Sequence, residues 1–173
     1  MGNKEVLSCI RQRKSIRRFE DRPVESEVLA RVTEAARLAP TACNRQNLQF
    51  HVLGPGSIHQ DFVKQACRVL GREKDFCYGA PYLIFVSFPA DSPMGREDMS
   101  CALMNMMLQC SAEGLGSVWI NQFRDCYGAP ELAPYWRRWG IGEGRLVYSA
   151  LALGWPAEDP EAKKRLEEVF YVD

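Results

Sequence analysis

Apolar residues recur at helical spacing in several stretches of the chain, and this pattern predicts its helices. They are expected at residues 4–12, 27–38, 57–70, 99–116 and 131–140. Proline lacks the N–H that a helix interior needs, so we expect Pro40 to stop the second helix and Pro134 to break the last. Gly71 is placed to cap the third helix in a left-handed conformation.

Shorter stretches that alternate in polarity, or are apolar throughout, are typical of strands. We expect strands at residues 47–53, 81–88, 117–123, 145–155 and 167–173. The nearly continuous apolar run at 81–88 indicates a buried central strand, and 89–98 is expected to be a loop. No repeat or long linker divides the chain. The order of elements therefore predicts one α+β domain over residues 1–173, with a single sheet and helices on both faces.

Composition and charge narrow the function more than the fold. Apolar residues make up 46% and charged residues 25% of the chain, as in ordinary globular domains. The 22 Lys and Arg balance the 22 Asp and Glu, which argues against nucleic acid or an anionic membrane as the main partner. No apolar run reaches the roughly 20 residues that span a bilayer, and the first residues lack a secretory signal. A cytoplasmic protein is expected.

Cysteine spacing bears on metal chemistry. The 7 cysteines form no C-x-x-C pair, and only 2 histidines accompany them. This pattern predicts no metal site and favours reduced, mostly buried thiols.

Residues 11–18 read RQRKSIRR, a local concentration of cations in a neutral chain. Arg13, Ser15 and Arg17 alternate where the first helix ends, so on an extended backbone their side chains point the same way. Two guanidinium groups flanking a hydroxyl suit a phosphate. The alternative is a set of solvated charges at a helix C-terminus, which the helix dipole favours.

A polar connection, APTACNRQNLQF at residues 39–50, joins the second helix to the first strand. It contains Thr41, Asn44, Gln46 and Asn47, whose side chains can hydrogen-bond the carbonyls and nitrogens of a heteroaromatic ring. The alternative is a polar loop that satisfies its own backbone.

Together these stretches resemble the nitroreductase family of FMN-dependent flavoproteins. RKSIRRF resembles the family's Arg-x-Ser-x-Arg/Lys-x-Phe segment, and a Pro-Val turn and an amphipathic helix follow it. Residues 39–50 resemble its Ala-Pro-Ser-x-x-Asn-x-Gln-Pro-Trp-x-Phe loop. The similarity continues through GAPYLIFVSF, AEGLGSVWI, ALALGWP and the late KKR, in the family's order.

The resemblance implies a nitroreductase-like fold, with a central, mainly antiparallel sheet flanked by helices, in an intertwined homodimer. One FMN would lie in each of two clefts between the subunits, and both subunits would contribute to each site. It also implies an FMN-dependent NAD(P)H oxidoreductase. NADH or NADPH would deliver hydride to flavin N5 and leave, and a small-molecule acceptor such as a nitroaromatic or quinone would then be reduced, with ping-pong kinetics. No catalytic side chain is required.

The resemblance assigns cofactor contacts residue by residue. Arg13 and Ser15 match phosphate-binding positions, with Lys14 beside them, and Arg17 matches the basic residue near flavin N1 and the C2 carbonyl. The loop that reaches the flavin from the partner subunit is matched by Pro40, Thr41, Ala42 and Asn44. The stretch whose backbone approaches flavin N5 is matched by Asn121 and Gln122. A late basic pair that closes on the phosphate is matched by Lys163 and Arg165.

Two departures from the family pattern concern the ring end of the site. Asn47 and Leu48 replace the usual Pro-Trp, and Gln122 stands where many members have glycine. The connection at 89–98 is also short for a lid, so an open cleft is expected. Aromatic residues that could line a slot for flat acceptors, or else simply fill the core, are Trp119, Phe123 and Tyr127, or Tyr135, Trp136 and Trp139.

The dimer has support from the apolar pattern itself. The helix at 99–116 is apolar enough to pack against its own copy, and we expect this contact to bury Met99, Leu103, Met106, Met107 and Cys110. The tail 167–173 is expected to add a strand to the edge of the partner's sheet.

Two other functions compete with the oxidoreductase. A flavin-binding carrier or sensor with little turnover would keep the phosphate anchor without a productive nicotinamide face. A single-stranded nucleic acid binder would use the basic run and Phe19, although no aromatic residues interleave with the cations.

Overall fold

The computed structural model describes residues 3–162 and 164–172. Its centre is a four-stranded sheet with the order β1-β2-β4-β3, in which every neighbouring pair is antiparallel. The strands are β1 (Gln49–Leu53), β2 (Tyr82–Pro89), β3 (Gly116–Ile120) and β4 (Arg145–Gly154). The helices are α1 (Asn3–Gln12), α2 (Ser26–Arg37), α3 (Ser57–Val69), α4 (Gly95–Ala112) and α5 (Ala133–Arg138), with 3-10 turns η1 (Ala42–Asn44) and η2 (Gln122–Asp125).

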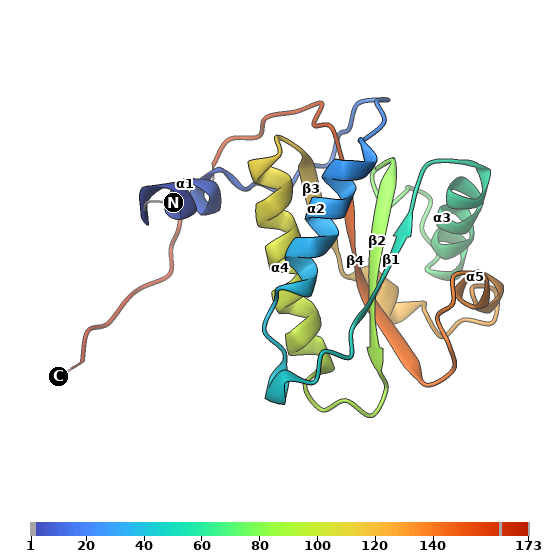
Figure 1. Cartoon of the computed structure of the whole chain (residues 1–173). Helices are drawn as coiled ribbons and strands as arrows, with labels where there is room; N and C mark the ends of the chain where they lie inside the picture. Colours follow the sequence, from blue (N-terminus) through green and yellow to red (C-terminus); the bar gives the residue numbers. More distant parts are fainter. Residues whose placement is uncertain (1–2, 163, 173) are drawn as a thin grey trace.

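Helices cover both faces of the sheet, which confirms the predicted α+β architecture. Figure 1 shows α2 and α4 on one face, and α3 and α5 on the other. The two central strands, β2 and β4, are buried almost throughout. They are apolar on both sides, because each side of the sheet packs against helices. Gly71 ends α3 with a φ of 61°, as expected of a left-handed cap.

The aromatic residues that could have lined a substrate slot belong mainly to the core under α3 and α5. The rings of Phe62 and Phe123 stack with centroids 5.8 Å apart, and the rings of Phe85 and Trp139 stack at 5.6 Å. Trp136 is buried in the same cluster. For this group the alternative of core packing is confirmed.

Several helix boundaries differ from the prediction, and two of the differences change how a loop or a proline was assigned. Helix α4 begins at Gly95, so the last residues of the expected loop 89–98 are helical. Pro134 lies in the first turn of α5 and does not break it. A proline is well accommodated there, because the first N–H groups of a helix have no partner inside the helix.

The expected self-association of α4 through its apolar residues is wrong in its choice of residues. All five (Met99, Leu103, Met106, Met107 and Cys110) are buried inside their own chain. The helix is apolar on several sides because it packs against α2, α1 and the sheet, and such a helix belongs to the interior.

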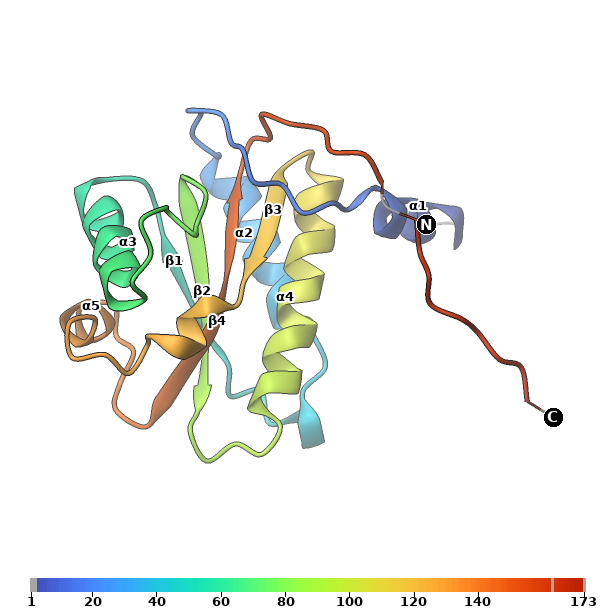
Figure 2. The ribbon, with the colours of Figure 1, turned by 180° about the vertical axis from the view of Figure 1, so that it is seen from behind.

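The two ends of the chain extend away from the body. Figure 2 shows α1 projecting beyond the C-terminal half of α4, and the C-terminal segment running outward past it. Of the strand expected at 167–173, residues 167–172 pair with none of the described strands, and Asp173 lies outside the described residues. Large apolar side chains are nevertheless exposed here: Val6, Leu7, Ile10, Leu166, Val169, Phe170, Tyr171 and Val172. Among the described helices, none is both long and apolar enough to cross a membrane.

Candidate functional site

The basic segment, residues 13–18, runs in extended conformation along the outer edge of β3. The N–H of Ile16 donates to the carbonyl of Ser117 at 3.0 Å, and Ser15 forms an isolated parallel bridge with the same residue. The two backbones approach closely because β3 begins with Gly116. A Cβ at that position would lie 2.7 Å from Cγ2 of Ile16. The alternating basic side chains therefore sit on a backbone that the sheet edge holds in place.

Two carboxylates share this edge with the cations. Nζ of Lys14 lies 2.6 Å from Oδ1 of Asp159, and the backbone N–H of Arg17 donates to Oε1 of Glu158 at 2.5 Å. Arg13, Lys14 and the two carboxylates line a small cavity of about 260 Å³, which Arg17 does not reach. The acidic pair was not foreseen from the sequence, because it lies 141 and 145 positions from its partners.

The guanidinium groups of Arg13 and Arg17 form no ion pair within the described part of the chain. Arg13 and Ser15 are half-buried, whereas Arg17 is exposed. Cζ of Arg17 lies 5.7 Å from the centroid of the Tyr78 ring, a cation–π distance. The segment therefore presents two guanidinium groups that no described carboxylate approaches within ion-pair distance, although Glu158 and Asp159 lie at the same edge.

The polar loop after α2 is folded on itself. Oγ1 of Thr41 accepts the N–H of Gln46 at 3.1 Å, and Oδ1 of Asn44 accepts the Gln46 side-chain amide at 2.7 Å. The N–H of Ala42 donates to a buried carboxylate of α4 at 2.8 Å, and Pro40 is exposed. Within one chain, Thr41 and Asn44 thus hydrogen-bond groups of their own loop, as expected for a polar loop that satisfies its own backbone.

One chain does not bring all the predicted contacts together. In Figure 1 the loop lies at the end of α2, and the basic segment lies near the opposite end of that helix. Asn121 follows β3 and is exposed, and its Oδ1 accepts the hydroxyl of Ser149 at 3.1 Å. Gln122 is half-buried at the start of η2.

The late basic pair contributes least to the described site. Lys163 falls outside the described residues. Arg165 lies in the exposed C-terminal segment and forms no salt bridge with the described residues.

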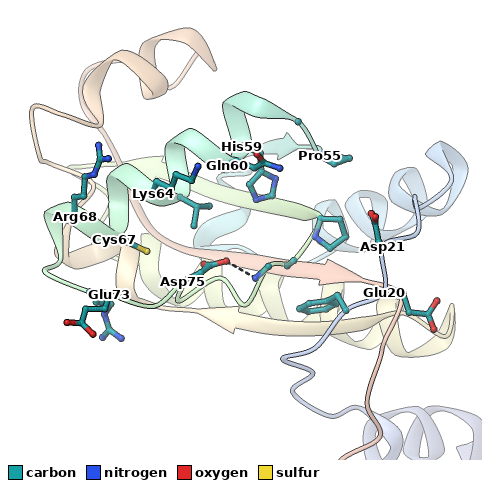
Figure 3. A pocket seen from close by; sticks show the side chains of 17 residues that line it. Glu20, Asp21, Pro55, His59, Gln60, Lys64, Cys67, Arg68, Glu73 and Asp75 are labelled. Carbon is teal, nitrogen blue, oxygen red and sulfur yellow. Dashed lines mark hydrogen bonds between the residues drawn. The ribbon is translucent and has the colours of Figure 1, made fainter.

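A larger cleft of about 670 Å³ lies between α3 and the connection before β2, and it contains none of the predicted contacts. Figure 3 shows Lys64 and Arg68 on its α3 wall, with Glu73 and Asp75 opposite them. Oδ2 of Asp75 accepts the N–H of Gly79 at 2.7 Å, so this carboxylate stabilises the connection. The pKa of Cys67, also in the wall, is raised by burial. Mixed charges of this kind provide no defined anion site.

Comparisons with known proteins agree with this architecture. The model of the nitroreductase family matches residues 10–71 and 60–155. A protein of Methanothermobacter thermautotrophicus, provisionally named an NADH dehydrogenase/NAD(P)H nitroreductase, is 29% identical over 163 residues, which cover 90% of this chain and 80% of that protein.

Solved structures give the same result. The nitroreductase with bound FMN from Bacteroides fragilis has a TM-score of 0.88 at 25% identity, covering 98% of this chain and 99% of its own. The nitroreductase with bound FMN from Desulfitobacterium hafniense has a TM-score of 0.87 at 22% identity and full coverage of both chains, which shows the shared fold. The family model matches most of the chain, and the fold agrees with that match. This chain therefore belongs to the nitroreductase family.

Proposed function

We propose that this chain is an FMN-dependent NAD(P)H oxidoreductase that works as a homodimer and reduces flat acceptors such as nitroaromatics and quinones. Family membership and the names of its relatives support the reaction class. The observation that carries the proposal is the extended segment with Arg13, Ser15 and Arg17 at alternate positions, held against the edge of β3.

The residues at this edge fit the phosphate end of FMN. Arg13 and Lys14 line the cavity, and guanidinium, ammonium and hydroxyl groups are the donors that a phosphomonoester prefers. Its volume of about 260 Å³ falls below that of a whole-cofactor pocket, so only the phosphate end fits there. The pair between Lys14 and Asp159 is a weak competitor, because the Asp159 side chain is 88% exposed to solvent.

A second subunit would supply what one chain lacks. The polar loop and the basic segment lie toward opposite ends of α2, and a two-fold axis can bring the loop of one subunit to the basic segment of the other. The exposed apolar residues of α1 and of the C-terminal segment offer contacts for such a partner. The outer edge of β1 is unpaired within the described chain, so it can accept an added strand.

The protein's own part in the reaction would be binding and orientation. Bound FMN would take up hydride from a reduced nicotinamide and pass the electrons to the acceptor. The guanidinium of Arg17 would stabilise negative charge at the pyrimidine end of the ring. The hydrogen bond from the Ser149 hydroxyl would hold the side chain of Asn121, in the stretch that the family resemblance assigns to flavin N5. The connection between β2 and α4 spans only residues 90–94, which would leave the acceptor side open.

The first test is the cofactor itself. The purified protein is expected to be yellow, and to oxidise NADH or NADPH when a quinone is added. Arg13→Ala is expected to weaken FMN binding at least tenfold, about the effect of losing one hydrogen bond to a charged group. Arg11→Ala is the matched control, because Arg11 is exposed on the last turn of α1 and does not line the cavity.

Fluorescence titration of FMN measures the affinity, and absorbance at 340 nm measures nicotinamide oxidation. A colourless protein that does not bind added FMN would refute the proposal. Tight FMN binding without reduction by either nicotinamide would instead favour the carrier or sensor.

A further inference from the structure

The loop between α2 and β1 holds an unusual concentration of strained backbone. Cys43, Asn44 and Gln46 have positive φ angles of 53°, 52° and 49°. Among the described residues, only Tyr78 is another non-glycine residue with a positive φ. For residues other than glycine this conformation has a free-energy cost, so it persists only where the surroundings impose it. All three residues are exposed, so the rest of the fold restrains them through contacts at the ends of the loop, in addition to the loop's own hydrogen bonds.

Asp98 restrains the first end. It lies in the first turn of α4, is only 4% exposed, and accepts the N–H of Ala42 through Oδ1 at 2.8 Å. Its other oxygen, Oδ2, is buried and has no hydrogen-bond partner among the described residues. Burial of a half-satisfied carboxylate is unfavourable for folding, which indicates a role other than stability.

Arg145 restrains the second end. It is the first residue of β4, and its Nη2 donates to the carbonyl of Asn47 at 2.8 Å. The same guanidinium binds Ser87 on β2 twice, from Nε to Oγ at 2.9 Å and from Nη2 to the carbonyl at 2.7 Å. Arg145 has no carboxylate partner among the described residues. The hydrogen bonds to β2 hold the Arg145 guanidinium in place, and the guanidinium in turn holds the end of the loop.

The two contacts act on opposite sides of the strained turn. Asp98 accepts a hydrogen bond from the N–H of Ala42, just before Cys43. Arg145 donates one to the carbonyl of Asn47, just after Gln46. Both come from rigid elements that are distant in sequence, 56 and 98 positions from their contacts. Between them, the loop's own hydrogen bonds are short-range: the N–H groups of Asn44 and Arg45 donate to the carbonyls of Thr41 and Ala42, and the N–H of Gln46 donates to the Thr41 hydroxyl.

We infer that Asp98 and Arg145 are positioning residues, which clamp the loop 41–47 in its strained conformation so that it can dock on FMN bound to the partner subunit. This inference rests on the proposed function for the identity of the ligand. The clamp itself is a property of the chain without cofactor, and it can be measured separately.

The first measurement is hydrogen–deuterium exchange in the FMN-free protein. Asp98→Asn is expected to speed exchange in residues 41–47 by about tenfold, because the neutral amide is a weaker acceptor for the Ala42 N–H. Asp98→Ala is expected to have the larger effect, since no acceptor remains. The melting temperature of Asp98→Asn should not fall, because the substitution removes a buried, half-satisfied charge. Glu97→Gln is the matched control in the same turn, because Glu97 is exposed and, unlike Asp98, forms no side-chain hydrogen bond with the loop among the described residues.

The second measurement is FMN affinity in the same variants. Asp98→Asn and Arg145→Lys are expected to weaken binding about tenfold, while Glu97→Gln binds as the wild type does. Wild-type exchange rates in both Asp98→Asn and Arg145→Lys would overturn the inference, and so would faster exchange with unchanged FMN affinity. A wild-type protein that never binds FMN would refute the proposed function, and exchange in the FMN-free variants would still decide whether the clamp exists.

Discussion

His51 and His59 are the chain's only histidines, and both lie where a charged ring is disfavoured. Nδ1 of His51 lies 3.0 Å from the carbonyl of Trp139, and a carbonyl only accepts, so Nδ1 carries the proton. Nε2 then accepts the hydroxyl of Ser87 at 3.1 Å, while that hydroxyl accepts from Arg145. A second proton on His51 would break this chain of donors beside a guanidinium.

Stability is therefore expected to depend on pH through these two rings. Burial lowers the pKa of both His51 and His59 below the ordinary 6.5, and Arg145 adds to the effect at His51. Below pH 6.5 the histidines of the unfolded chain bind protons more readily than those of the folded chain. The free energy of unfolding therefore has its full value above pH 6.5 and declines as the pH falls through the lowered pKa values of the folded state. Urea unfolding of the FMN-free protein at pH 7.5, 6.5 and 5.5 measures this decline.

His59→Gln is expected to reduce the dependence. The contribution of Glu113 lies outside this window, because its hydrogen bond from Arg31 lowers a carboxyl pKa that starts at 4.5. Equal free energies of unfolding at the three pH values would contradict the prediction.

At the scale of elements, the attachment of the basic segment to β3 depends on one glycine. Gly116→Ala would place a Cβ 2.7 Å from Cγ2 and 2.9 Å from Cβ of Ile16, and neither atom is at the end of a flexible chain. The free energy of unfolding is expected to fall by about 1–3 kcal/mol, as for other overpacked sites, and FMN affinity should fall with it.

Gly128→Ala is the matched control for this prediction, because an added Cβ there would meet nothing within 4 Å and the backbone has no positive φ. Chemical unfolding and FMN titration of both variants make the comparison. Equal behaviour of the two variants would show that the segment can shift freely along the edge.

What could be predicted from the sequence follows from how local each signal is. Periodicity located the helices and central strands, and the alternate spacing of Arg13, Ser15 and Arg17 anticipated the extended segment. Helix α4 was misread because apolar residues on several sides look the same whether the neighbours are α2 and the sheet or a second subunit. The roles of Asp98 and Arg145 had no local signal, since each contacts a loop that only the tertiary fold brings near.

At the scale of the whole molecule, the C-terminal segment stands apart from the compact body. Beyond Pro160 it makes no hydrogen bond to the rest of the described chain, and Phe170 is 77% exposed. A run of exposed apolar side chains such as residues 169–172 is expected to be buried by a partner.

Two substitutions separate the core from the interface. Phe170→Glu is expected to give a folded monomer with native circular dichroism, because its side chain contributes little to its own chain's core. Met106→Glu is expected to unfold the protein, because Met106 is fully buried and an unpaired charge there costs several kcal/mol. Light scattering gives the mass, and circular dichroism the folding. A Phe170→Glu protein that keeps the dimer mass, or a folded Met106→Glu protein, would contradict this assignment.

Under the proposed function, the outlying C-terminal segment would also make the retention of FMN depend on protein concentration. If each FMN is enclosed by parts of two chains, separation of the subunits opens the site, so occupancy obeys mass action in protein as well as in flavin. Diluting a yellow solution would then shed free, fluorescent flavin even without competing ligand, and concentrating it again would recover the colour at a rate that is second order in polypeptide.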